Sequence, residues 1–426
     1  MNSKELQNPI YGIRWQRQIT VLAIVFILSV VAPAAQAQTY QVIHRFSNGD
    51  DGANPAAGLS IDNAGRLYGT TTEGGTHDYG TVFRLVHSGS SWVLSPLYNF
   101  AGGSDGEYPE SRVIFGPDGS LYSVAGGGST GCGGYGCGIV FSLRPPSTAC
   151  KTALCPWTKT TLHAFEGSDG DGPVGDLLFD AGGGIYGATY AGGIKYNDEG
   201  VVYHLTPSNG GWSETVLYNL PLYSLHNPEA GVTLDEAGNL YGTAESQPDG
   251  YGGVFELTPS GGVWVENEIY AFQGGSDGGL PYAGVILDDA GNLYGATPLF
   301  GANNGGTVFE LTPSNGSWVF SVLYGFTGSG SGLSGPLANL VFDAAGDLYG
   351  TTYSDGAYGL GAVFKLTPGP SGWTYTSLHD FTGPEGANPL SNVIFDGNGN
   401  LYGTTAGGGR HDVCNTGCGV VWEITP

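Results

Sequence analysis

Short apolar runs alternate with glycine-rich turns along almost the whole chain. The clearest marker is a tripeptide of Leu or Ile, Tyr and a small residue, which recurs seven times at intervals of 53 to 64 residues. Its tyrosines are Tyr68, Tyr122, Tyr186, Tyr241, Tyr294, Tyr349 and Tyr402. A recurring period of this size predicts that one supersecondary unit of about fifty residues is copied seven times.

Each copy predicts a sheet of four strands. In the fifth copy the apolar runs span residues 284–288, 293–297, 306–312 and 318–326. Asp and Gly between the first two runs, and Pro-Ser-Asn-Gly between the last two, are typical of tight turns, because Asp caps the turn and Gly takes its positive φ. A longer glycine-rich loop joins the second run to the third. The unit is therefore a four-stranded antiparallel sheet.

The two ends of the chain predict how the sheets are arranged. Residues 40–46 resemble a fourth strand with no unit before it, and the seventh copy stops after its third strand, residues 419–425. Pairing these two segments would complete the last sheet and close a ring without open edges. The prediction is an all-β, seven-bladed β-propeller of four-stranded antiparallel blades, closed by the N-terminal strand in the C-terminal blade. An open solenoid, the alternative, explains neither the extra strand nor the missing one.

Six fourth strands contain a Trp that lies eight residues before a Phe or Leu. These residues are Trp92, Trp157, Trp212, Trp264, Trp318 and Trp373. In an unbulged strand an even spacing places both side chains on one face, so we expect the aromatics to fill the space between neighbouring sheets. The alternative is an exposed row of Trp that stacks on sugar rings.

Composition supports a folded all-β protein. Of 426 residues 77 are Gly, and only 12% are charged, which fits many tight turns around short strands. High Gly content alone would suit a disordered chain, but 40% hydrophobic residues and regularly placed aromatics indicate buried faces.

The first residues differ from the repeats. Lys4, Arg14 and Arg17 precede an apolar run over residues 19–31, and small residues follow up to Ala37. This run is short for a bilayer span and is typical of a secretory signal. We predict a signal peptide over residues 1–37, followed by a single propeller domain over residues 38–426 that is secreted to the periplasm or beyond. An uncleaved membrane anchor is the alternative.

The chain is strongly acidic, with a formal net charge of −25. Removal of residues 1–37 takes away three of 13 basic and one of 38 acidic residues, which leaves 10 against 37, a net charge of −27. Such a charge repels nucleic acid and anionic membranes, so neither is an expected partner. A glycan or protein ligand is compatible with it, and so is a monomer kept soluble by its charge.

Six cysteines form three close pairs. They are Cys132 with Cys137, Cys150 with Cys155, and Cys414 with Cys418. In an exported chain, short-range pairs in glycine-rich loops predict local disulfides. The competing hypothesis for the last pair is a zinc site that includes His411, although zinc sites usually have shorter gaps and a further ligand.

The repeat resembles a known family. The order G-x-V-F-x-L-T-P, W, L-Y-x-F and D-x-x-G-N-L-Y-G-T-T is similar to the Gloeo/Verruco ("GloVer") tandem repeat of exported bacterial proteins. The resemblance covers nearly all residues after the predicted signal and implies export. Many members carry a C-terminal anchor, which we do not expect here because the sequence ends at Pro426. The resemblance implies no activity and therefore no catalytic residues.

Polar residues gather in two kinds of connection, the second-to-third loops and the fourth-to-first connections, which a propeller places on one rim. The candidate ligand-binding residues there are His77, Asp78, Asp105, Asp169, Asp277, Asp355, His411 and Asp412. Loops on a rigid scaffold often carry function. Carboxylates around one mouth could hold Ca²⁺, but no calcium-loop pattern is present and Asp before Gly is ordinary turn chemistry. No metal or other cofactor is therefore assigned.

Two function hypotheses follow. The first is an exported, non-enzymatic scaffold that binds a ligand through the variable rim, because the repeats contain no unique catalytic constellation. The second is a calcium-assisted hydrolase, lactonase or polysaccharide lyase, with acids and His at the central mouth. For the second, His77-Asp78 and His411-Asp412 occupy equivalent loops of the first and seventh blades and would be neighbours in a closed ring.

Overall fold

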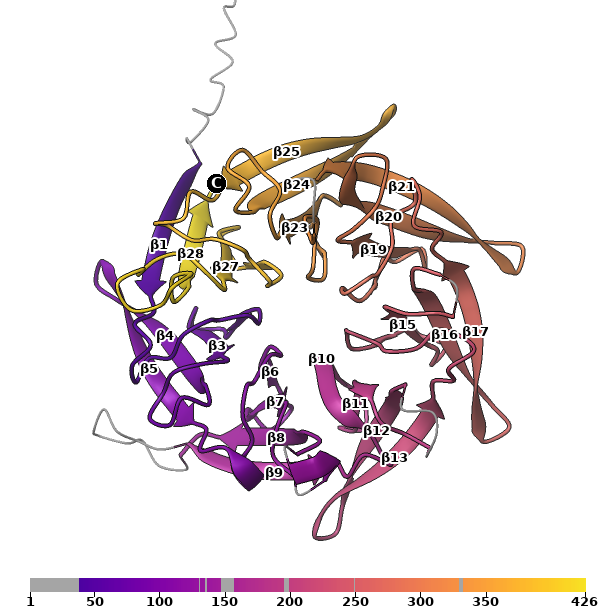
Figure 1. The fold of residues 1–426 in the computed structure, drawn as a ribbon, viewed down its shortest axis with the longest axis horizontal. Helices are drawn as coiled ribbons and strands as arrows, with labels where there is room; N and C mark the ends of the chain where they lie inside the picture. Colours follow the sequence, from indigo (N-terminus) through magenta and orange to yellow (C-terminus); the bar gives the residue numbers. More distant parts are fainter. Residues whose placement is uncertain are drawn as a thin grey trace, which may run out of the picture. The chain divides into compact units, whose positions relative to one another are not determined.

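The computed structural model describes residues 38–129, 131–134, 136–146, 157–194, 199–248, 250–328 and 332–426. In these residues 28 strands form seven four-stranded sheets, all antiparallel. The sheets follow one another around a ring, one for each repeat (Figure 1). The predicted seven-bladed β-propeller is confirmed. The predicted signal peptide lies outside the described residues, among which no helix is long and apolar enough to cross a membrane.

The blades are numbered from the first complete repeat, and the strands of each run outward from the centre of the ring. Blade 1 contains β2 (Ser60–Ile61), β3 (Leu67–Thr71), β4 (Thr81–Ser88) and β5 (Ser91–Asn99). Blade 2 contains β6 (Ile114–Phe115), β7 (Leu121–Ala125), β8 (Ile139–Arg144) and β9 (Thr158–Ala164). Blade 3 contains β10 (Asp171–Phe179), β11 (Ile185–Ala191), β12 (Val201–Ser208) and β13 (Gly211–Asn219). Blade 4 contains β14 (Thr233–Leu234), β15 (Leu240–Ala244), β16 (Gly253–Ser260) and β17 (Val263–Ala271).

The remaining blades repeat this order. Blade 5 contains β18 (Ile286–Leu287), β19 (Leu293–Thr297), β20 (Asn304–Ser314) and β21 (Ser317–Thr327). Blade 6 contains β22 (Val341–Phe342), β23 (Leu348–Thr352), β24 (Ala362–Gly369) and β25 (Gly372–Asp380). Blade 7 contains β26 (Ile394–Phe395), β27 (Leu401–Thr405), β28 (Val420–Thr425) and β1 (Thr39–Arg45). Two short 3-10 helices, η1 (Gly103–Asp105) and η2 (Cys132–Gly134), lie in loops.

The N-terminal strand closes the ring as predicted. Strand β1 pairs with β28, with Tyr40 opposite Ile424 and Val42 opposite Trp422. Blade 7 is thereby built from both ends of the chain, so the third strand of the last repeat gains the fourth strand that its own sequence lacks. An open solenoid is excluded by this pairing.

The repeated Asp and Tyr hold the turn between the first and second strands. In blade 5, Asp288 Oδ1 accepts hydrogen bonds from the backbone N–H groups of Ala290 and Asn292, each at 2.9 Å. The Tyr294 hydroxyl donates to the other carboxylate oxygen at 3.2 Å. These bonds favour the ionised form and lower the pKa of Asp288, although burial opposes them. The recurring Asp is therefore a turn cap, as its position predicts.

The small residue after each Tyr has a packing reason. In blade 5, Gly295 lies opposite Phe309 across the β19–β20 ladder. A Cβ atom at Gly295 would lie 2.4 Å from Phe309 Cζ, closer than atoms can approach. Trp422 lies over Gly403 in the same way, at 2.3 Å. The absent side chain lets a large aromatic lie flat on the neighbouring strand.

One expectation about the Trp residues is wrong. A bulge in each complete fourth strand shifts the pairing by one residue; in blade 1, Phe83 faces Pro96 and Val82 faces Tyr98, so Leu97 is the extra residue. The bulge turns the later part of the strand over. Trp92 therefore packs toward blade 7, whereas Phe100 packs toward blade 2. The predicted filling of the space between sheets holds, but the two aromatics serve opposite junctions.

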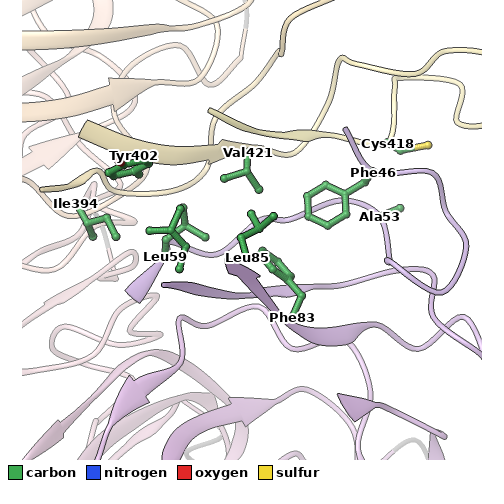
Figure 2. Packing of buried hydrophobic residues seen from close by; sticks show 10 residues of the cluster. Phe46, Ala53, Leu59, Phe83, Leu85, Ile394, Tyr402, Cys418 and Val421 are labelled. Carbon is green, nitrogen blue, oxygen red and sulfur yellow. The ribbon is translucent and has the colours of Figure 1, made fainter. Parts of the chain in front are cut away.

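The core is divided among the seven junctions between neighbouring blades. Figure 2 shows the junction that joins blade 7 to blade 1, where Phe46 and Val421 meet Leu59, Phe83 and Leu85. Six further clusters follow the same arrangement around the ring. The hydrophobic stabilisation of each blade therefore depends on both of its neighbours.

Each outer strand also presents one side chain to the preceding blade. This residue, which we call the outer contact residue, lies opposite the third-strand Leu or Ile. The seven outer contact residues are Leu94, Lys159, Glu214, Glu266, Phe320, Tyr375 and Tyr40.

Most outer contact residues meet a complementary partner. Lys159 pairs with Asp105 at 3.0 Å, and Glu266 accepts a hydrogen bond from the Tyr218 hydroxyl at 2.9 Å. Three others stack on an aromatic ring of the preceding blade: Phe320 on Tyr270, Tyr375 on Tyr324, and Tyr40 on His379. The junctions thus have the same strand arrangement, but an ion pair, a hydrogen bond or aromatic stacking connects the two blades in different cases.

Two of the predicted disulfides are present. Cys132 bonds to Cys137 and Cys414 to Cys418. The second bond contradicts a zinc site on Cys414 and Cys418, because a disulfide sulfur is not a thiolate ligand. The predicted Cys150–Cys155 pair lies outside the described residues.

We expect the Val42→Asp variant to lose about 3 kcal/mol of unfolding free energy, because it places an unpaired charge in the cluster between blades 6 and 7. Urea unfolding measures this loss. Thr39→Asp, at the exposed start of the same strand, introduces the same charge and should leave the midpoint unchanged. Equal midpoints for Val42→Asp and the wild type would contradict the role of β1 in closure.

Candidate functional site in the central channel

Each fourth-to-first connection contains a proline, and the residues from this proline onward, here called the proline segment, run from the rim to the first strand of the next blade. The segment begins at Pro55, Pro109, Pro173, Pro228, Pro281, Pro336 and Pro389. The residue before the proline donates its backbone N–H to a loop of the preceding blade, for example Leu280 to Tyr251 O at 2.6 Å. Leu280 takes a φ of 53°, which is uncommon for a residue with a side chain. The segments are therefore fixed by their neighbours before they reach the centre.

Residues one to three positions after the prolines line a central cavity of about 180 Å³, to which all seven blades contribute. The first residues after the prolines are Ala56, Glu110, Val174, Glu229, Tyr282, Leu337 and Leu390. The third residues after the prolines are Gly58, Arg112, Asp176, Gly231, Gly284, Asn339 and Asn392. The fourth residue is Leu or Val in every blade and is buried. The residues that line the cavity therefore differ in chemical type from blade to blade, whereas the buried residues behind them do not.

A pair of carboxyl groups lies at one side of this channel. Glu229 lines the cavity and is hydrogen-bonded to Glu245, which belongs to the second-to-third loop of the same blade. The Tyr282 hydroxyl of blade 5 donates to Glu245 Oε1 at 3.1 Å. Burial, the nearby Glu245 and the more distant Glu110 together raise the pKa of Glu229 to about 8. At neutral pH, Glu229 is therefore mostly protonated.

Glu110 enters the channel from blade 2. Its side chain is accessible to water in the channel but is enclosed by the channel walls, and this desolvation raises the pKa of its carboxyl group. Two residues further along the chain, Arg112 makes a salt bridge to Asp176 of blade 3, with Nη2 and Nε at 2.7 and 3.0 Å from the same oxygen. The channel therefore contains the Arg112–Asp176 ion pair and two carboxyl groups with raised pKa values, those of Glu110 and Glu229.

The other side of the channel is less polar. Asn339 accepts a hydrogen bond from the Gly284 backbone N–H at 2.7 Å, and Leu337 and Leu390 line the cavity beside it. Gly231 lies so close to Asp176 that a Cβ atom would be 2.1 Å from the Asp176 carbonyl oxygen. The absence of a side chain there allows the inner segments of blades 3 and 4 to meet.

The two kinds of polar connection lie together on one rim. Isolated bridges pair Ala53 with Glu73 and Ala387 with Gly407, and each joins a fourth-to-first connection to a second-to-third loop. The rim also holds a hollow of about 520 Å³ over the closure, lined in part by Glu73 and by the loop of the Cys414–Cys418 disulfide.

Three of the sequence-predicted carboxylates hold their own connections together. Asp105 accepts from the Tyr98 hydroxyl at 2.6 Å, and Asp277 accepts from the Tyr270 hydroxyl at 3.1 Å. Asp169 takes the same position with a histidine, His163, at 3.0 Å. Each also accepts a backbone N–H of its own turn, at 2.7 to 2.9 Å. None of the three lines the described cavities, and their ligand-binding role stays a prediction.

The remaining predicted residues are spread over the rim loops. His77 and Asp78 are exposed, and Asp78 accepts the Gly74 N–H at 2.9 Å. His411 and Asp412 are also exposed, and Asp412 pairs with Arg410 at 2.8 Å. In the described part of the chain no hydrogen bond or ion pair joins the two His-Asp pairs. Asp355 is half-buried, and burial raises the pKa of its carboxyl group.

Sequence reasoning missed the channel residues. Their signal is visible once the proline segments are aligned: Tyr282, Arg112 and Asp176 each occur in one blade at their position, and Glu occurs at the first position in two blades, as Glu110 and Glu229. A site that is used once in a symmetric ring has to be built from residues that break the repeat. The candidates chosen from the sequence lie in the variable loops of the rim instead.

The ring of seven four-stranded blades, with a polar channel at its axis, defines the class of this protein as a seven-bladed β-propeller. The chain belongs to the Gloeobacter/Verrucomicrobia repeat family, whose pattern matches residues 11–249 and 227–426. The comparison with curated proteins gave no match.

The comparison with solved structures found several similar chains. A Bacteroides uniformis protein assigned as a 6-phosphogluconolactonase is 17% identical, with 76% of this chain and 84% of that chain covered and a TM-score of 0.48. A Thermus thermophilus protein assigned as a glucose dehydrogenase is 16% identical, with 91% and 100% covered and a TM-score of 0.43. A Xanthomonas campestris gluconolactonase is 14% identical, with 73% and 85% covered and a TM-score of 0.38. Similarity at this level does not bear on activity.

We expect the stability of the protein to fall as pH rises from about 5 to about 8. An ordinary Glu ionises near pH 4.5, whereas folded Glu229 keeps its proton to about pH 8, so in this window the folded state binds the extra proton. Below this window both states are protonated and the group adds no slope. Glu229→Gln should therefore show a smaller drop in melting temperature between pH 5 and pH 8 than the wild type.

Differential scanning calorimetry at the two pH values measures the drop. Glu236→Gln, on an exposed turn of the same blade, is the matched control and should keep the wild-type drop. The raised pKa of Glu110 acts in the same direction, so a part of the slope remains in the Glu229 variant. An unchanged drop in Glu229→Gln would show that Glu229 is ionised in the folded protein.

Proposed function

We propose that this protein is an exported binding scaffold whose ligand, a neutral molecule rich in hydroxyl groups such as a glycan, binds at the mouth of the central channel. The observation that carries the proposal is the distribution of variety between blades. Turn caps, aromatic positions and buried aliphatics recur around the ring, whereas the first and third residues after the prolines differ and converge on one cavity.

The chemistry of the channel favours such a ligand. Carboxyl oxygens of Glu229 can accept hydrogen bonds, the Asn339 amide can donate them, and the Tyr282 hydroxyl adds a further polar group around a small cavity. A hydroxyl group both donates and accepts, so it can satisfy donors and acceptors that alternate around the cavity. The surplus of carboxyl groups disfavours anionic ligands. These groups act together on a ligand that enters from the rim of variable loops.

The disulfides support the export part of the proposal. Bonds such as Cys132–Cys137 and Cys414–Cys418 persist in oxidising compartments outside the cytosol. The second bond closes a loop that lines the rim hollow beside the channel mouth. A rigid rim is what a binding scaffold requires, since a preorganised site loses less entropy when the ligand binds.

A glycan array followed by calorimetric titration tests the proposal. Tyr282→Phe removes one hydroxyl at the channel mouth and should weaken binding about tenfold, the effect of one hydrogen bond of roughly 1.4 kcal/mol. Tyr218→Phe removes a hydroxyl that donates to Glu266 at an outer junction and should leave affinity unchanged. Binding by neither protein on the array, or equal binding by wild type and Tyr282→Phe, would refute a glycan site in the channel.

A second candidate function, hydrolysis of a lactone or glycan, is favoured by one observation. The carboxyl group of Glu229, whose pKa is raised to about 8, is hydrogen-bonded to that of Glu245, and paired carboxyl groups of which one has a raised pKa serve in general acid and base catalysis. For such an enzyme, Glu229→Gln should lower turnover at least a hundredfold while Glu236→Gln does not. Wild-type turnover on lactone and glycan panels, measured with chelator and with added Ca²⁺, decides between the candidates, because a pure binding scaffold gives none.

A further inference from the structure

The junction between blades 2 and 3 differs from the others at its outer edge. The outer contact residue there is Glu214 on β13, and it faces His163 on β9 and Asp169 in the connection that follows β9. A His nitrogen and one oxygen from each carboxylate all lie within 4.8 Å of one another. His163 Nε2 and Asp169 Oδ2 are 3.0 Å apart.

This junction leaves a polar atom unsatisfied. Glu214 Oε1 is buried and has no hydrogen-bond partner in the part of the chain that the structure describes. The equivalent residue of blade 4 is Glu266, whose two oxygens accept hydrogen bonds from Tyr218 and Ser224, each at 2.9 Å. The same side chain at the same position is therefore satisfied in one junction and not in the other. An unpaired buried carboxylate oxygen is costly, so a bound species is expected to complete it.

The charges point to a cation as that species. Glu214 and Asp169 are both carboxylates and face the same space, so they repel one another when both are ionised. In the junction between blades 1 and 2 the outer contact residue is Lys159, which brings its own positive charge to Asp105. In the junction between blades 2 and 3, no lysine or arginine of the described residues pairs with these three groups. A divalent cation would play the part that Lys159 plays one blade earlier.

The donor set indicates which cation. One imidazole nitrogen and two carboxylate oxygens are ligands that Zn²⁺ accepts, with about 2.0 to 2.2 Å to each and a fourth position for water. Ligand atoms around a tetrahedral ion of that size are roughly 3.4 Å apart, so small side-chain rotations would bring the three atoms into place. Ca²⁺ binds through oxygen and uses six or more ligands, which suits this group poorly.

We propose that His163, Asp169 and Glu214 form a Zn²⁺ site that joins the outer edges of blades 2 and 3. The ion would connect a strand of one blade to a strand of the next, at the distance from the axis where the hydrophobic junction ends. His163 is already held against Phe165, with ring centroids 4.7 Å apart, so its ring is oriented before the metal binds. The role is structural and independent of the channel.

A second set of possible metal ligands lies nearby, but it cannot bind Zn²⁺ through its cysteines. Cys132, Cys137 and Asp171 also lie within ligand distance of one another. Their two sulfurs are joined in a disulfide, which cannot supply thiolate ligands. The disulfide lies beside the same connection, because the Gly172 N–H donates to Cys137 O at 3.0 Å. It therefore helps to hold the Asp169 segment in position.

Metal titration of the untagged protein, purified after export and stripped with chelator, tests the site. We expect one Zn²⁺ per chain by calorimetry and a rise in melting temperature on saturation, because the metal binds the folded state. Glu214→Gln should weaken Zn²⁺ binding at least about a hundredfold, since it removes one of three ligands. Glu266→Gln, the same substitution at the equivalent position of blade 4, should keep both the affinity and the melting shift.

The metal-free proteins provide a second readout. Glu214→Gln should melt at or above the metal-free wild type, because it removes the repulsion from Asp169 and remains folded. A proton in place of the metal would give a melting temperature that depends on pH but not on Zn²⁺, which would overturn the proposal. So would a shift with Ca²⁺ alone, or equal Zn²⁺ affinity in Glu214→Gln and the wild type.

Discussion

The pairing of β1 with β28 is the constraint on which the ring depends. Every blade buries its two faces against two neighbours, and no blade has a core of its own. Without Tyr40 and Val42 opposite Ile424 and Trp422, the cluster between blades 6 and 7 would be open on one side. Because the two strands are separated by almost the whole chain, closure requires the most non-local contact in the molecule, and such contacts form late in folding. Stability and cooperativity therefore depend on the meeting of the two ends.

A closed ring also explains where the sequence is free to vary. The Gly295 type of position has to be small because an aromatic ring lies on it, and the Asp288 type has to accept three donors in a tight turn. The first residue after each proline faces the channel instead, where no close-packed neighbour fixes its volume. Glu229 and Tyr282 can thus stand where other blades have Leu or Ala. The symmetric scaffold positions a set of groups that is not symmetric.

The acidic character of the protein has more than one structural meaning. Asp105 and Asp277 close their own turns, and Lys159 or a Tyr hydroxyl balances them. In the channel, Glu229 and Glu245 are close enough for one to keep its proton. At the junction of blades 2 and 3, Asp169 contacts His163, whereas Glu214 Oε1 has no hydrogen-bond partner among the described residues. The same residue type is therefore a turn cap, a proton donor or a ligand, according to what lies opposite to it.

The sequence by itself determined the number of blades, the four-stranded unit, the turn caps and the closure, because each is encoded in a short segment that recurs. It also placed two disulfides, whose partners are close in the chain. Only the tertiary structure decided that a bulge at Leu97 sends Trp92 and Phe100 to different junctions. It alone brought Glu110, Arg112 and Asp176 to one axis, and Glu214 to His163. These groups come from different repeats. The sequence of a repeat determines the structure of its own blade. Contacts between blades depend on the geometry of the ring, which no single repeat contains.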